Sequence, residues 1–254
     1  MILRLDRRVL AAAVLVCWVV GMIALARRRH DVSDVDLLTR GALRLEPATY
    51  FYVVSQNGQQ IGFATSTIDT SAGGFTAREI VRARMRIAGD SQSITATSVA
   101  FLTRGFALDS FALSVSGDQK PFRLHGTPEA HSGVLLPALA PIALMLTREP
   151  RVGATTGSWL YNPVARRVER VTLSIAAESL FRVVDSAAFD STRHEWMVAH
   201  TDTVRSWKIA TPSRAVSAWV DSQGRIVAAS EAGGVALTRT AYEIATLNPK
   251  LLTH

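Results

Sequence analysis

The side chains best able to do chemistry cluster in the second half of the 254-residue chain, at His194, Glu195, His200 and Asp202. A zinc-binding helix of the H-E-x-x-H type places its histidines one helical turn apart, whereas His194 and His200 are six residues apart. In a β-strand, even spacing would put such side chains on one face. A metal-dependent enzyme using His194, Glu195 or His200 is therefore kept as a minor hypothesis. The sequence predicts no metal ion and no cofactor.

Four aspartates could supply the paired carboxylates of a glycoside hydrolase, namely Asp185, Asp190, Asp202 and Asp221. Their contexts, mostly Asp-Ser or Asp-x-x-Gly, are typical of turns, where the carboxylate accepts hydrogen bonds from backbone N–H groups. The sequence contains neither the G-x-S-x-G string of α/β-hydrolases nor the glycine patterns of Rossmann and P-loop proteins. We therefore expect no catalytic residues and a protein that is not an enzyme.

A long apolar run near the start of the chain predicts a membrane anchor over residues 1–29. Val9 to Ala26 is an uncharged stretch of 18 residues with arginines on both sides. As a helix it would rise about 27 Å, close to the thickness of the hydrocarbon layer. Ala24-Leu25-Ala26 has the form of a signal-peptide cleavage site, but the run is long for a signal peptide and Arg27 follows directly. We expect an uncleaved, single-pass helix that binds the lipid bilayer.

The charge of the chain does not predict nucleic-acid binding. The formal net charge is +7, but six arginines and one aspartate beside the apolar run carry +5 of it, which leaves +2 for the remainder. Such a remainder offers no basic face for phosphates. The single cysteine, Cys17, lies inside the apolar run, so the chain has no intramolecular disulfide.

Residues 45–250 have the pattern of a mainly β (α+β) domain, an antiparallel meander after a linker or membrane-proximal helix at 30–44. Asn57-Gly58 predicts a hairpin turn, and Ile80 to Ile87 alternates between basic and apolar positions, as in a half-buried strand. Two β blocks are expected, 45–126 and 150–237, with Thr238 to Thr246 as a short C-terminal helix. Four tryptophans in predicted strands are expected to pack the core, or else to line a groove for a lipid or peptide: Trp159, Trp196, Trp207 and Trp219.

Residues 133–147 interrupt this pattern with an apolar segment that carries two prolines. The segment is too short to span a bilayer and too apolar all round for a surface helix. We expect it to be a buried helical plug. The residues predicted to line a lipophilic cavity there are Leu135, Leu136, Leu139, Ile142 and Leu146.

Two motifs carry a resemblance to a known domain. They are Gln56 to Gly62 (QNGQQIG) and Ala218 to Val227 (AWVDSQGRIV), the latter followed by Leu237 to Thr240 (LTRT). Together they resemble the β domain that accompanies transglutaminase-like cores in bacterial envelope proteins, which is similar to the half-barrel of LolA-like lipoprotein carriers. The resemblance covers about Leu45 to Asn248 and implies a curved antiparallel sheet around a helical plug and an apolar cavity. The transglutaminase-like core itself is absent, because it needs a nucleophilic cysteine and the only cysteine is Cys17.

Two functions follow as expectations. The first is a membrane-anchored envelope module that binds or carries a lipophilic ligand or a lipid-modified partner such as a lipoprotein. The second is a structural scaffold that docks other envelope proteins on an edge strand. The expected location is the bacterial inner (cytoplasmic) membrane, with the C-terminal domain on the extracytoplasmic side because the N-terminal tail is short.

Overall fold

A computed structural model of the protein describes residues 34–43, 45–87, 90–117, 121–127, 134–147, 149–162, 165–210, 216–231 and 234–247. The predicted membrane anchor at 1–29 lies outside these ranges. Within them, none of the helices has the length and apolar character needed to cross a membrane.

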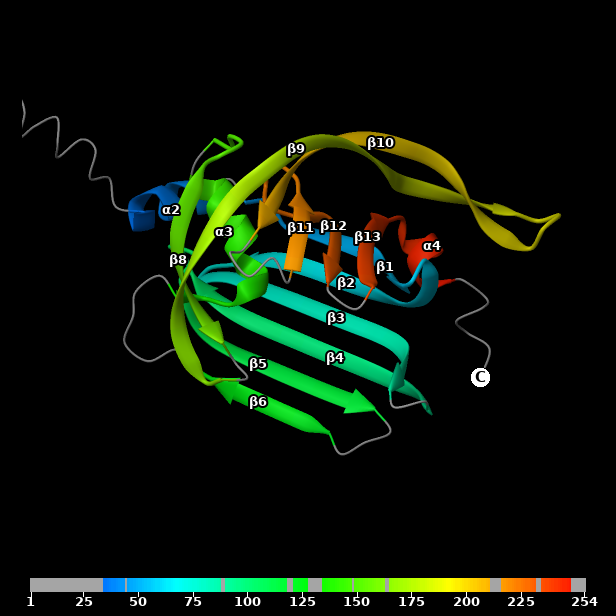
Figure 1. The fold of residues 1–254 in the computed structure, drawn as a ribbon, viewed down its shortest axis with the longest axis horizontal. Coiled ribbons are helices and arrows are strands. Elements are labelled where there is room, and N and C mark those ends of the chain that lie inside the picture. The colour runs from blue at the N-terminus through cyan, green and yellow to red at the C-terminus, as the bar shows by residue number, and fades with distance from the viewer. Residues whose placement is uncertain are drawn as a thin grey trace, which may run out of the picture.

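The described residues form one curved sheet of 13 strands that does not close on itself (Figure 1). Its order is β6-β5-β4-β3-β2-β1-β13-β12-β11-β10-β9-β8-β7. Neighbouring strands are antiparallel, except that β7 and β8 are parallel. The predicted mainly β fold with a curved antiparallel sheet is therefore confirmed. The strands of the first block are β1 (Ala48–Gln56), β2 (Gln59–Ser71), β3 (Gly74–Ile87), β4 (Asp90–Thr103), β5 (Leu108–Gly117) and β6 (Phe122–Gly126).

The first block follows the sequence pattern closely. Asn57 and Gly58 both have positive φ angles, 51° and 80°, as a two-residue hairpin turn requires. Along β3, Ala77 and Ala83 are buried, whereas Arg82 and Arg84 are exposed. The basic face of this strand is thus its solvent face, as the alternation predicts.

The two β blocks join into one sheet through the pairing of β1 with β13 (Val235–Thr240), in which Val53 lies opposite Thr238. The prediction of a helix from Thr238 is therefore wrong for its first residues, and the C-terminal helix α4 is only Tyr242–Thr246. The cause is tertiary. The edge of β1 has backbone N–H and C=O groups that need partners, and a strand that contains the β-branched Thr238 and Thr240 supplies them. The other strands of the second block are β8 (Thr155–Asn162), β11 (Val216–Val220) and β12 (Ile226–Glu231).

Two long strands, β9 (Arg167–Asp190) and β10 (Glu195–Ala210), form the middle of the second block. Residues 179–190 and 195–206 pair only with each other, since β8 pairs with the start of β9 and β11 with the end of β10. This part, called the hairpin arm below, extends to the end of the molecule opposite α2 (Asp34–Ala42) (Figure 1).

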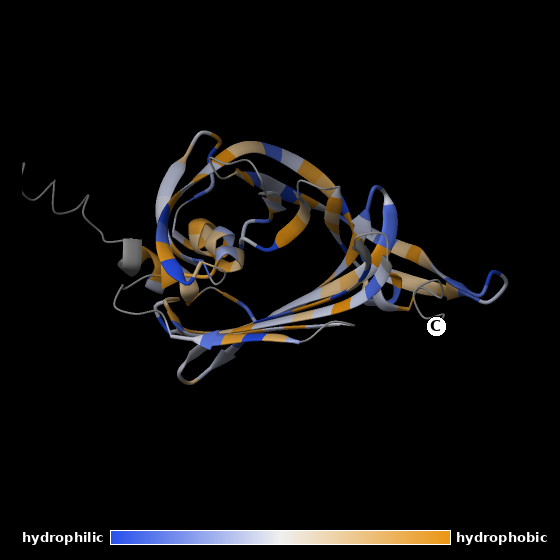
Figure 2. Ribbon diagram, turned by 60° about the horizontal axis from the view of Figure 1, so that its bottom comes forward, coloured by the Kyte–Doolittle hydropathy of each residue, from blue (hydrophilic) through white to orange (hydrophobic). Residues whose placement is uncertain are grey.

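The apolar segment folds as the short strand β7 (Val134–Leu135), a 3-10 turn η1 (Pro137–Leu139) and the helix α3 (Ala140–Thr147). The helix α3 lies within the curve of the sheet (Figure 2). One core cluster includes residues of η1, α3, both β blocks and α2. The helix α2 contributes Leu38 and Ala42 to this core, so it packs with the β domain.

Candidate binding site

The candidate site is the interior of the curved sheet around η1 and α3, together called the plug. Leu135, Leu136, Leu139 and Ile142 are buried, and Leu146 packs half-buried against the same core. The predicted burial of the plug is confirmed. These side chains fill the core, and their role in contacting a ligand stays a prediction.

Two glycines allow neighbouring elements to approach the plug closely. Gly224, in the turn between β11 and β12, has a φ of 76°, and a Cβ atom there would overlap the backbone of Ile142. A Cβ atom at Gly41 of α2 would overlap the backbone carbonyl of Leu146. The plug is therefore held from two sides by backbone contacts that only glycine permits.

An apolar pocket of about 370 Å³ lies beside α3. Leu144, Ala154 and Ile175 belong to or pack against the core, so they form its apolar wall. Glu149 and Arg151 also line it and form an exposed ion pair at 3.1 Å. Its size falls at the lower end of the range for small-molecule sites.

A second, much smaller cavity of about 20 Å³ lies on the other side of the plug, next to Leu139 and Ile142. It is lined by polar groups of Tyr52, Glu79 and Arg225, among others. A space of this size suits about one water molecule. It is too small for a ligand unless the plug moves.

Arg225 is the most deeply buried charged residue described here, with 3% of its surface exposed. Its Nη2 atom donates to the backbone oxygen of Glu46 at 2.9 Å, while Nε and Nη1 have no partner among the described residues. Burial lowers the pKa of the guanidinium. Unpaired donors of this kind carry a desolvation cost, so a bound water in the cavity is the simplest partner for them.

Glu79 interrupts the apolar row of β3, because it shares the inner face with Ala77 and Ala83. Burial raises the pKa of its carboxyl group. Burial also raises the pKa of Tyr52, whose hydroxyl donates to the backbone oxygen of Ile226 at 3.3 Å. The cavity therefore favours uncharged carboxyl and phenol groups beside a buried cation.

Asp221 and Asp190 are turn residues, as predicted. Oδ1 of Asp221 accepts the backbone N–H groups of Gln223 and Arg225 at 3.0 Å, and its Oδ2 pairs with Arg239 at 2.9 Å. Oδ1 of Asp190 accepts two backbone N–H groups at the tip of the hairpin arm. Both carboxylates accept backbone N–H groups, as is typical of aspartates in turns.

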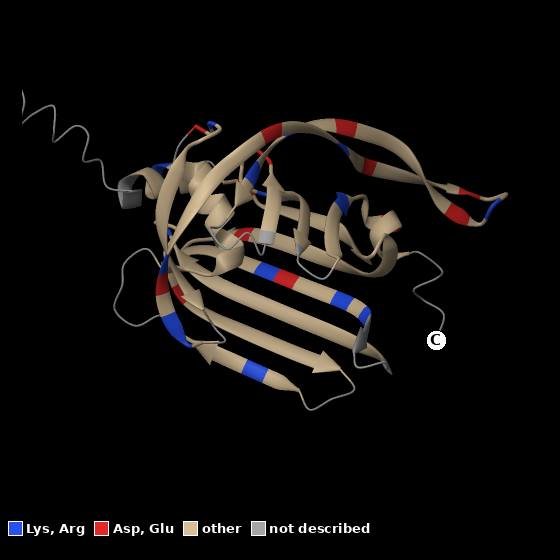
Figure 3. Ribbon diagram, viewed as in Figure 1, with Lys and Arg blue, Asp and Glu red and all other residues tan. Residues whose placement is uncertain are grey.

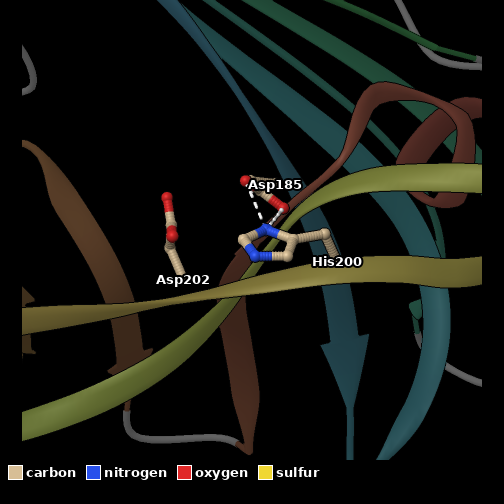
Figure 4. Close-up of side chains that lie close together, drawn as sticks. All are labelled: Asp185, His200 and Asp202. Carbon is tan, nitrogen blue, oxygen red and sulfur yellow. Dashed lines mark hydrogen bonds and ion pairs between the residues drawn. The ribbon is translucent and has the colours of Figure 1, made fainter.

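The turn prediction is wrong for Asp185 and Asp202, which lie inside β9 and β10. Figure 4 shows both beside His200 on the hairpin arm. The polar cluster expected from the sequence is only partly formed, because His194 lies in the arm's turn with a φ of 54°. Sequence reasoning assigned Asp185 to a turn and did not place it beside His200, because no local pattern links the two residues.

The tryptophans do not all pack the core. Of the four tryptophans in the described strands, only Trp207 is buried, whereas Trp159 is 39% exposed beneath the guanidinium of Arg170. Trp196 packs on Phe189 of the hairpin arm, with ring centroids 5.5 Å apart. A continuous tryptophan-lined groove is therefore not formed by these residues.

Comparisons with known proteins give no family. No protein-family model matches the chain, and a search of curated proteins finds no match. A DUF1089 family protein from Pseudomonas aeruginosa is similar in structure, with 9% identity and a TM-score of 0.38 over 67% of this chain and 90% of that one. A β-barrel-like protein of the domain of unknown function DUF1849 from Brucella abortus has 12% identity and a TM-score of 0.40, over 77% and 95%. The resemblance to transglutaminase-associated and LolA-like domains stays a prediction.

Proposed function

We propose that this protein is a non-catalytic binding module of the bacterial cell envelope, anchored in the inner membrane by residues 1–29, that holds a lipophilic ligand against α3. The observation that carries the proposal is the apolar pocket of about 370 Å³ beside the plug. Its walls combine Leu144 and Ile175, while a charged pair, Glu149 and Arg151, stands beside them. Such a lining suits an acyl chain with a polar end at the rim.

We place the ligand beside the plug, and the plug itself stays in the core. Expelling the plug would expose Leu139, Ile142 and their neighbours, at about 1.5–3 kcal/mol for each large apolar side chain. The close contacts at Gly41 and Gly224 also hold the plug in place. A pocket already open beside α3 requires no such rearrangement.

The test is native mass spectrometry of the full chain in detergent, followed by lipid extraction and titration with a fatty acid. We expect bound lipid in the wild-type protein and less of it in Ala154→Leu, which adds volume at the pocket wall. Ala176→Leu is the matched control, because Ala176 is exposed on β9. A wild-type protein that carries no lipid and takes up none on titration would contradict the proposal.

A second candidate function is a scaffold, and the hairpin arm favours it. Leu180, Phe189 and Val198 of the arm are each more than half exposed. Exposed apolar side chains on a projecting element are common at protein contacts. This version places the partner on the hairpin arm, whereas the sequence suggested an edge strand. Co-purification of another envelope protein that is lost in Phe189→Ser would support it.

A further inference from the structure

Beyond the proposed lipophilic site, the hairpin arm brings three potential metal ligands together from two strands. His200 and Asp202 are two residues apart on β10, so their side chains share a face. The register is the same on both sides of this point, since Val198 pairs with Ala187 and Thr201 with Val184, with a local irregularity in between. This register brings Asp185 next to His200, so the three side chains share one face of the hairpin.

The side chains of Asp185, His200 and Asp202 are all exposed to solvent. His200 Nδ1 lies 2.9 Å from both carboxylate oxygens of Asp185. One ligand atom from each of Asp185, His200 and Asp202 lies within 4.8 Å of the others. The Asp202 carboxylate makes no hydrogen bond with the imidazole or with other described residues. The three ligand atoms are therefore close enough for one ion to bridge them after small movements of the side chains.

We propose that Asp185, His200 and Asp202 bind one divalent transition-metal ion of the zinc class. Bonds of about 2.1 Å place two ligand atoms of a tetrahedral ion about 3.4 Å apart, so the side chains need to move by about 1 Å. The movement is unhindered because the side chains of His200 and Asp185 are 62% and 40% exposed. Two carboxylates and one imidazole, which gives up its proton when the ion binds, also match the charge and the mixed N/O preference of such an ion.

The ordinary account of this cluster is a surface ion pair between His200 and Asp185. In that account Asp185 holds the imidazole directly, and Asp202 adds only an electrostatic attraction without a hydrogen bond. Variants of Asp202 separate the two accounts, because its carboxylate takes no part in the ion pair.

The experiment is titration calorimetry of the full chain in detergent with Zn²⁺, purified without a polyhistidine tag, with the bound metal counted by elemental analysis. We expect one Zn²⁺ per chain, and binding weakened at least about tenfold in His200→Ala, Asp202→Asn and Asp185→Asn. His194→Ala is the control, because His194 is exposed in the same hairpin but outside the cluster. Mg²⁺ should not compete, since it prefers oxygen ligands alone.

Two results would overturn the proposal. One is the absence of zinc binding by the wild-type chain at millimolar Zn²⁺. The other is binding that is equal in the wild type and in Asp202→Asn, which would place the ion elsewhere. The three altered positions are exposed, so melting temperatures should match that of the wild type and confirm that the variants are folded.

Discussion

The plug and the hairpin arm are the two parts of this protein that depart from the regular sheet, and they have opposite surroundings. The plug is apolar and enclosed, with Leu139 and Ala140 almost fully buried. The two strands of the arm pair only with each other, and the arm exposes the side chains of Leu180 and Phe189. This difference indicates that the apolar contacts that stabilise the fold are concentrated around the plug. The arm, by contrast, contributes little to the core, so its exposed side chains can contact a partner or a ligand.

Charge separates the same two regions. The hairpin arm with its turn carries four acidic residues against three arginines, although the whole chain has a net charge of +7 (Figure 3). The solvent face of β3 is basic, with Arg78, Arg82 and Arg84 exposed. The arm therefore has nearly balanced charges, whereas the solvent face of β3 is basic.

The largest expected effect tests the enclosure of the plug. Leu139→Asp should lower the free energy of unfolding by at least about 3 kcal/mol, because it removes apolar burial and places an unpaired charge in the core. Leu180→Asp on the arm should change it by about 0.5 kcal/mol or less, since this side chain is 67% exposed. Denaturant unfolding measures both, and similar losses would break the comparison.

The second effect tests the close contact at Gly224. Gly224→Ala should cost about 2–3 kcal/mol, because a methyl group there meets the backbone of Ile142 at a positive φ. Gly153→Ala is a matched control, since its φ is 88° and nothing lies within 4 Å of the added atom. The control should lose only about 1 kcal/mol for its backbone conformation. Equal losses in thermal unfolding would mean that the plug does not press on this turn.

The third effect is a gain of stability that depends on pH. Because burial raises the pKa of Glu79, the folded state binds more protons than the unfolded state above the ordinary glutamate pKa, and stability falls as pH rises through that window. Glu79→Gln should therefore be more stable than the wild type at pH 7, and equal to it below about pH 4. The exposed Glu195→Gln should show no such gain. A gain independent of pH would exclude titration of Glu79 as its cause.

The smallest effect concerns the arm. Phe189→Ser should change the free energy of unfolding by about 0.5 kcal/mol or less, although it removes a ring contact with Trp196, because both rings lie on an exposed element. A loss near that of Leu139→Asp would show that the arm is part of the folded core. Urea unfolding followed by circular dichroism is sufficient to distinguish the outcomes.

Local patterns in the sequence were enough for the strands of the first block and for the burial of the plug. Alternation in β3 predicts which arginines face solvent, and Asn57-Gly58 fixes a hairpin turn, since both depend only on neighbouring residues. The membrane anchor at 1–29 stays a prediction, because it lies outside the described residues. The same patterns failed at Thr238, where pairing with β1 overrides a helical tendency.

The sequence by itself determined that this protein has a β domain with a buried apolar segment, because hydrophobic periodicity is set by the order of residues along the chain. Only the tertiary structure decided that β13 pairs with β1, that Glu79 and Arg225 line one cavity, and that Asp185 lies beside His200. These contacts bring together residues that are from 15 to more than 140 positions apart in the sequence. They depend on strand register and on the packing of distant strands, which no short stretch of sequence specifies.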